Sequence, residues 1–201
     1  RVRYLSDEEE KRLFANLPDW LRPFVIIARE TGLRLSNIAN LTWKQVNLFN
    51  RMIIVETTKN GEPVGIPMTD NVYEVLKNLN KVRLIDSNFI FGNKGRPFRR
   101  WWISNSFKKV CEKAAIENFR FHDLRHDFYS RLVQRGVDLY TVPALVGHKN
   151  IATIQRYAHL SPEKLKSAVE VLNFGHNLDT MGTSQKKQYC NPLKKNRGER
   201  I

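Results

Sequence analysis

The pattern of hydrophobic and polar positions divides the chain into short amphipathic segments, most of them with a helical period. Residues 7–16 are charged and amphipathic, and Ser6 followed by Glu9 is the signature of a capping box at their start. Residues 20–31 are apolar on most sides, as in a buried helix, and Gly32 is suited to end that helix in a left-handed conformation. The chain therefore opens with two predicted helices, the second of them buried.

A short third helix and then a β-hairpin are predicted next. Ser36 is placed to cap a helix that runs to about residue 41. Residues 52–58 (MIIVETT) and 63–68 (PVGIPM) have the composition of strands and flank the turn Lys59-Asn60-Gly61. The pattern places Lys59 at the tip of this hairpin.

The rest of the periodic region is mainly helical. Helices are predicted at 70–80, 104–115, 122–135, from 138, from 150 and from 162, with a strand at 89–91 and a basic loop at 91–100. The last helix carries a single apolar stripe, which either packs on its own core or docks on a neighbouring molecule. From residue 174 the period is lost and Lys and Arg predominate, which predicts a flexible basic tail over 174–201. The sequence thus predicts a mainly α (α+β) domain over 1–173, with a small antiparallel β-hairpin or sheet.

The charge balance favours a polyanionic partner. Lys and Arg number 34 against 20 Asp and Glu, a formal net charge of +14 at pH 7. Ribosome-binding and membrane-surface proteins share this balance. No apolar stretch approaches the roughly 20 residues of a membrane span, and Cys111 and Cys190 lack the spacing of a disulfide framework or a CxxC metal site. We therefore expect a soluble protein of the reducing cytoplasm, with nucleic acid as the favoured partner.

Two motifs bring cationic side chains to predicted helix ends. His122-Asp123-Leu124-Arg125 places an imidazole and a guanidinium on one helical face, within reach of a single phosphate. Thr31-Gly32-Leu33-Arg34 presents a second arginine from a tight turn, and two guanidinium groups can share one phosphate. Taken alone, each motif also fits a helix cap or a solvated surface arginine.

A histidine and a tyrosine complete an ordered set of motifs. Leu145-Val146-Gly147-His148 ends one predicted helix, and Tyr157 follows nine residues later. In this order TGLR, the lysine of TKNG, HDLRH, LVGH and the tyrosine resemble the tyrosine site-specific recombinases, the phage-type integrases. The resemblance spans about residues 4–172 and is carried by the joint order and spacing of motifs that are individually weak.

The resemblance implies a mixed helical catalytic domain that cuts and rejoins DNA strands through a covalent 3′-phosphotyrosine, without metal or nucleotide cofactor. The roles it implies are a phosphate clamp by Arg34 and Arg125, assistance by His122 and His148, protonation of the leaving 5′ oxygen by Lys59, and attack by Tyr157. A phenol has a pKa near 10, so the tyrosine needs a proton acceptor or a strongly cationic pocket. His122 is the candidate base.

The same residues leave a metal-binding interpretation to be weighed. His122 and His126 stand at i and i+4, as two metal ligands on one helix face would. Asp123 and Asp127, however, lack the further distant ligands that an HD-type hydrolase needs. We therefore expect His126 to support the structure, and activity to persist in the presence of a chelator.

We expect double-stranded DNA as the partner, bound mainly through its phosphates. The candidate contact residues are Lys94, Arg96, Arg99, Arg100, Lys108, Lys109 and Arg120. For a recombinase, the resemblance implies a homo-tetramer on two duplexes, a monomer without DNA, and a location at the cytoplasmic nucleoid. A type IB topoisomerase-like monomer that relaxes one duplex, and a non-catalytic DNA-binding protein of the same fold, are the alternatives.

Two departures from the family pattern bear on these expectations. Asn37 stands three places after Arg34, where the family commonly has an acidic residue that helps to orient the arginine. Family members also usually carry an amino-terminal DNA-binding domain of roughly one hundred residues, which is absent from this sequence. We therefore expect the chain to be a fragment that binds DNA less tightly than the whole protein.

Overall fold

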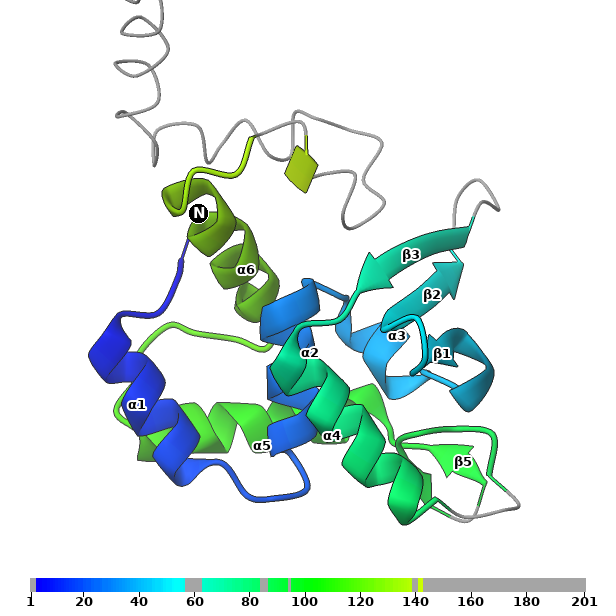
Figure 1. The fold of residues 1–201 in the computed structure, drawn as a ribbon. Coiled ribbons are helices and arrows are strands. Elements are labelled where there is room, and N and C mark those ends of the chain that lie inside the picture. Colours follow the sequence, from blue (N-terminus) through cyan, green and yellow to red (C-terminus); the bar gives the residue numbers. More distant parts are fainter. Residues whose placement is uncertain (1–2, 57–62, 84–86, 94, 139–140, 143–201) are drawn as a thin grey trace, which may run out of the picture. The chain divides into compact units, whose positions relative to one another are not determined.

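The computed structural model describes residues 3–56, 63–83, 87–93, 95–138 and 141–142, all within the first of two compact units, residues 1–162. Its helices are α1 (Asp7–Asn16), α2 (Arg22–Thr31), α3 (Leu35–Ala39), α4 (Asp70–Lys81), α5 (Arg100–Lys113) and α6 (Asp123–Gln134), with a 3-10 turn η1 (Trp43–Gln45). Its strands are β1 (Val46–Asn47), β2 (Met52–Glu56), β3 (Pro63–Pro67), β4 (Gly92–Asn93) and β5 (Arg96–Pro97). Figure 1 shows these elements as a helical assembly with a small sheet, which confirms the expected mainly α class.

The two opening helices are confirmed, together with the signals that bound them. The hydroxyl of Ser6 accepts from the amide of Glu9 at 3.2 Å, and the Glu9 carboxylate accepts from the amide of Ser6 at 3.0 Å. Gly32 ends α2 at φ 64°, with its amide donating to the carbonyl of Ala28 at 3.0 Å. Glycine takes this left-handed conformation without the penalty that a Cβ imposes.

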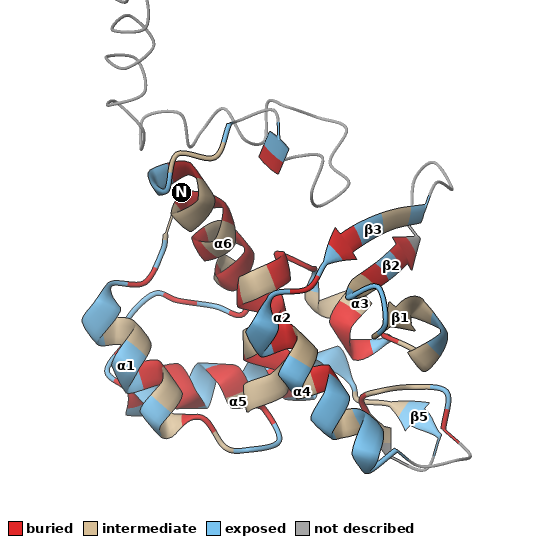
Figure 2. Cartoon of the chain, in the orientation of Figure 1, coloured by how far each residue is buried: buried red, intermediate tan, exposed pale blue. Residues whose placement is uncertain are grey.

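Helix α2 lies at the centre of the core because it is apolar on most sides. Phe24, Val25, Ile27 and Ala28 are buried on it, and it packs against α3, α4 and α6 (Figure 1). Buried residues concentrate on α2 and on the α6 that packs against it (Figure 2). Helix α1 packs against α5 instead. None of the described helices has the length and hydropathy that a membrane crossing requires.

The two predicted hairpin strands are β2 and β3 of a three-stranded antiparallel sheet with the order β1-β2-β3. In β2 and β3, Ile53 stands opposite Ile66 and both are buried, while Glu56 stands opposite Pro63. Residues 57–62, which include Lys59 and the predicted turn, lie outside the described residues. Strand β1, which pairs with β2, was not predicted because its two residues are too short to show a period.

The segment from residue 89 to 104 differs from the sequence prediction. The strand at 89–91 is wrong: Phe89 makes only an isolated bridge to Thr42, and the strand begins at Gly92. The supposed basic loop at 91–100 contains the β4–β5 hairpin, which turns at Gly95 with φ 73°. Helix α5 begins at Arg100 rather than 104. Trp102 lies in its first turn and stacks on Trp20, with ring centroids 4.2 Å apart, and this contact stabilises the turn.

The structure also bears on the predicted starts of two further helices, α3 and the helix expected from Asp138. Arg34, not Ser36, is the N-cap of α3, and Ser36 lies inside the helix, whose first turn bonds to the Arg34 carbonyl. Of the helix predicted from Asp138, the structure describes only Asp138, Thr141 and Val142; the Asp138 carboxylate accepts from the amide of Thr141 at 3.0 Å, as an N-cap does. Beyond Val142 the predicted helices, the apolar stripe and the basic tail lie outside the described residues.

Candidate active site

The turn after α2 presents Arg34 to solvent. Thr31 and Leu33 are buried on either side of Gly32, and the hydroxyl of Thr31 accepts from the amide of Leu33 at 3.3 Å. Arg34 follows in extended conformation, with an exposed side chain. The amide of Asn37 donates to the Arg34 carbonyl at 2.9 Å, which ties the backbone of the arginine to α3.

The start of α6 holds the second motif. The Asp123 carboxylate accepts from the amide of Arg120 at 2.8 Å, which closes the turn that leads into the helix. Leu124 is fully buried and anchors this turn in the core, whereas His122 is exposed. His122 and Arg125 share one helical face, and the His126 ring meets the His122 ring edge to face, with centroids 5.1 Å apart.

A long-range contact joins the two motifs. Arg125 is 5% exposed, and its Nη1 donates to the carbonyl of Gly32, a residue 93 positions earlier in the chain. The Arg125 guanidinium also lies over the ring of Tyr129, 5.2 Å from its centroid. A Cβ at Gly32 would lie 2.6 Å from Cδ1 of Phe128, so only glycine lets α6 approach the turn this closely. The turn that presents Arg34 and the start of α6 therefore form one unit.

The electrostatics of His122 reflect this gathering of cations. Although His122 lies at the surface, neighbouring protein atoms shield part of its ring from water, and this desolvation lowers the pKa of His122. The positive charges of Arg125 and Arg34 lower it further, against an opposing effect of Asp123. A lowered pKa favours the neutral imidazole, which has a lone pair that can accept a proton. An exposed guanidinium, a buried one and a neutral imidazole together offer an anion two charges and a nearby proton acceptor.

The structure thus brings together three of the six predicted catalytic residues. Lys59, His148 and Tyr157 lie outside the described residues, as does Lys94 of the predicted DNA contacts, and their placement stays a prediction. Within the described ranges no group of three or more His, Cys, Asp or Glu side chains is arranged to hold a metal ion.

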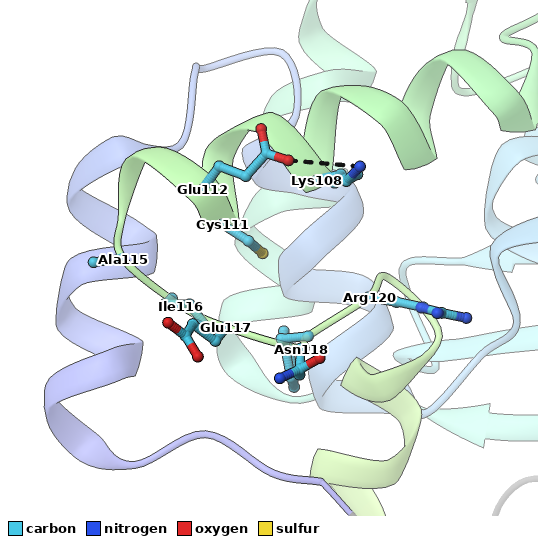
Figure 3. A pocket seen from close by; sticks show the side chains of 9 residues that line it. Lys108, Cys111, Glu112, Ala115, Ile116, Glu117, Asn118 and Arg120 are labelled. Carbon is cyan, nitrogen blue, oxygen red and sulfur yellow. Dashed lines mark ion pairs between the residues drawn. The ribbon is translucent and has the colours of Figure 1, made fainter.

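The other predicted DNA-contact residues are all exposed and lie on several elements of the chain. Arg96 lies on β5, Arg99 and Arg100 at the start of α5, Lys108 and Lys109 further along α5, and Arg120 before α6. Lys108 pairs with Glu112 at 3.6 Å, and Lys108 and Arg120 flank a cavity of about 590 Å³ beside α5 (Figure 3). Its lining contains neither Arg34, His122 nor Arg125. The cavity is therefore separate from the candidate site.

Cys111 lines the same cavity and is 2% exposed. Burial, with smaller contributions from Asp123 and Glu112, raises the pKa of its thiol to about 12. Because the thiolate is the reactive form, the raised pKa disfavours reaction of Cys111 at neutral pH.

Sequence reasoning missed one pair of charged residues behind the site. Arg29 on α2 and Asp127 on α6 are both buried, and Nε of Arg29 lies 3.3 Å from Oδ2 of Asp127. The signal that could have revealed Arg29 is its position within the otherwise apolar run FVIIA-R. A charge on a buried helix needs a partner, although the sequence does not say which.

Comparison with known proteins places these features in a family context. A family model described as the phage integrase family matches residues 3–164. The integrase of Salmonella phage P22 is 33% identical over 204 residues, which cover 95% of this chain and 53% of that protein. The chain therefore spans about half the length of this relative.

Solved structures show the same architecture. The catalytic domain of bacteriophage HP1 integrase superposes with a TM-score of 0.65 at 27% identity, covering 85% of this chain and 95% of that domain. The integrase of transposon Tn1549, solved in complex with circular intermediate DNA, gives a TM-score of 0.69 at 25% identity and covers 84% of this chain and 65% of that one.

Proposed function

This chain belongs to the phage integrase family of tyrosine recombinases, and we propose that it is the catalytic part of a site-specific DNA recombinase. The reaction proposed is cleavage and rejoining of DNA strands through a 3′-phosphotyrosine, without metal or nucleotide cofactor. The observation that carries the proposal is the bond from Arg125 to the Gly32 carbonyl, because it gathers Arg34, His122 and Arg125 at one place.

The phosphate is bound between two guanidinium groups. The exposed Arg34 meets the non-bridging oxygens of the scissile phosphate from solvent, and the buried Arg125 is held in place by its bond to Gly32. Guanidinium groups match phosphate geometry and stay charged at any physiological pH. Their two charges offset the negative charge that builds up on the pentacoordinate transition state, which is the stabilisation that catalysis needs.

The nucleophile is Tyr157. Its phenolic oxygen forms a bond to the scissile phosphorus while the bond from phosphorus to the 5′ oxygen breaks, and the phenolic proton passes to His122. The lowered pKa of His122 keeps the ring neutral and ready to accept that proton. Lys59 gives a proton to the leaving 5′ oxygen, and His148 assists at the phosphate. Rejoining is the reverse sequence, in which a 5′ hydroxyl attacks the phosphotyrosine.

The proposed partner is double-stranded DNA. The DNA complex of the similar Tn1549 integrase supports this assignment, as do the exposed basic residues along β5, α5 and the loop before α6. Contacts to phosphates from such residues make binding fall steeply with salt. The active assembly proposed is a homo-tetramer on two duplexes, formed from monomers when DNA binds, at the cytoplasmic nucleoid.

Covalent capture on nicked DNA tests the proposal. The whole chain is incubated with a pool of nicked duplexes of randomised sequence, from which the short strand downstream of the cut diffuses away and traps the intermediate. We expect a covalent complex that survives denaturation with the unsubstituted chain and with Tyr140→Phe, and none with Tyr157→Phe. Arg34→Ala should abolish trapping, whereas Arg51→Ala, an equal change of charge at an exposed arginine paired with Asp70, should not.

Two outcomes would overturn this assignment. A chain that binds DNA but forms no covalent complex is a non-catalytic DNA-binding protein of the same fold. A monomer that relaxes supercoiled plasmids of any sequence is a topoisomerase, whereas cleavage confined to captured sequences with inverted repeats supports the recombinase.

A further inference from the structure

The buried ion pair between Arg29 and Asp127 connects the two helices that carry the candidate site. Nε of Arg29 lies 3.3 Å from Oδ2 of Asp127, and the two side chains are 7% and 1% exposed. Arg29 stands three residues before Gly32, and Asp127 two residues after Arg125. At a rise of about 1.5 Å per residue, the pair therefore lies within one or two turns of the bond between Arg125 and Gly32.

Both partners have a second attachment. Oδ1 of Asp127 accepts from the amide of Leu5 at 3.0 Å, and Oδ2 lies 3.9 Å from Nη1 of Arg131. Nη2 of Arg29 pairs with the carboxylate of Glu10 on α1. The carboxylate of Asp127 thus links α6 to the peptide that enters α1, and Arg29 links both to α2.

Stability alone explains such a pair poorly. Burying two charges costs desolvation energy, and apolar residues of similar volume at such sites often give a protein that is equally stable or more so. What an ion pair adds is geometry. Nε of Arg29 and Oδ2 of Asp127 make no hydrogen bond within the described part of the chain, so their burial is compensated by their mutual attraction, which falls as the helices move apart. A slide of α6 along α2 by one helical turn, about 5.4 Å, would carry the two charges beyond ion-pair distance and leave each without the other in the core.

We propose that Arg29 and Asp127 are positioning residues for strand cleavage, which fix the register of α6 against α2 and so the separation of Arg34 from His122 and Arg125. This inference rests on the proposed function. Neither side chain touches the DNA. The pair acts through the turn after α2 and the start of α6, which carry the residues that do. The packing of Phe128 against Gly32 and the bond from Arg125 to Gly32 then hold the same register at the site itself.

The test separates positioning from stability with matched variants. Arg29→Met combined with Asp127→Leu removes the pair but keeps the volume buried, and Asp127→Asn removes one charge. The control is Glu10→Gln, which breaks the other ion pair of Arg29, on a helix that carries none of the site residues. Each 201-residue chain is measured for thermal midpoint, DNA affinity, single-turnover rate of covalent complex formation at saturating DNA, and the pKa of His122 by NMR.

We expect the double variant to keep a thermal midpoint close to that of the parent while its single-turnover rate falls at least about tenfold, because small misplacements of reacting groups are costly. The pKa of His122 should rise toward the ordinary 6.5, because Arg34 and Arg125 are held less closely around it. DNA affinity should change by no more than about threefold, since the phosphate contacts are kept. Glu10→Gln should leave both the rate and the His122 pKa unchanged.

A double variant that folds, cleaves at the parental rate and keeps the parental His122 pKa would overturn the inference. So would equal losses of rate in Asp127→Asn and Glu10→Gln. If the double variant does not fold, Asp127→Asn and Arg29→Lys decide by the same criteria at temperatures where circular dichroism shows them folded. If the unsubstituted chain forms no covalent complex, the proposed function fails, and the NMR titration of His122 in these variants still decides whether the pair sets the geometry.

Discussion

Replacing Gly32 by alanine tests the packing on which the candidate site depends. The residue has φ 64°, and a Cβ there would lie 2.6 Å from Cδ1 and 3.0 Å from Cε1 of Phe128. The left-handed backbone costs an alanine about 1–2 kcal/mol, and forcing an extra carbon into a packed contact costs about 1–3 kcal/mol more. Gly32→Ala should therefore lower the free energy of unfolding by about 2–5 kcal/mol, measured by urea denaturation.

The control is Gly95→Ala, because Gly95 has φ 73° and a Cβ there would meet no atom within 4 Å. It should lose only the backbone cost of about 1–2 kcal/mol. In a Phe128→Ala background, the loss from Gly32→Ala should fall to the same value, since the contact partner is gone. Equal losses at Gly32 and Gly95 in the parent chain would refute the close approach of α6 to the turn that presents Arg34.

Three further predictions address other parts of the structure. Ala115 follows α5 with φ 50°, a left-handed conformation that favours glycine. Ala115→Gly should therefore raise the free energy of unfolding by roughly 1 kcal/mol, measured by urea denaturation. A loss of stability would contradict the left-handed conformation. His122 should titrate by NMR below 6.5, and because the unfolded state then binds more protons, stability should fall as pH drops through 6.5 toward the native pKa. Arg34→Gln should raise the pKa of His122 that this titration gives, and an unchanged pKa would place Arg34 too far from the ring to act on it. In a Cys190→Ser background, Cys111, with its pKa raised to about 12, should resist a thiol reagent at pH 8 until urea unfolds the chain; rapid reaction in buffer would contradict its burial.

Local signals in the sequence were sufficient for most of the helices. The capping box at Ser6, the terminal Gly32 and the period of residues 70–80 each act within a few residues of the chain, so the pattern carries them. The misplaced start of α5 has a different origin, because the stacking of Trp102 on Trp20 joins residues far apart in the sequence. Strands of two residues, such as β1, are set by pairing with a neighbour and leave no period of their own.

In the candidate site too, local motifs predicted residues but not the contacts between distant parts of the chain. The motifs identified Arg34, His122 and Arg125, but not the bond from Arg125 to the Gly32 carbonyl that brings them together, because no local pattern records a contact across 93 residues. The Arg29–Asp127 pair escaped notice for the same reason, since each charge finds its partner only in the folded core. The roles of Lys59, His148 and Tyr157 remain predictions from the family pattern.

Mass spectrometry of the trapped complex identifies the residue that attacks the DNA. Digestion with trypsin, which cuts after Arg156 and Lys164, releases residues 157–164 (YAHLSPEK) as one peptide with a single tyrosine. We expect this peptide to carry the mass of a 3′-linked nucleotide after nuclease treatment, with fragment ions that assign the added mass to Tyr157. A nucleotide attached to any other residue, or linked through a 5′ phosphate, would contradict it.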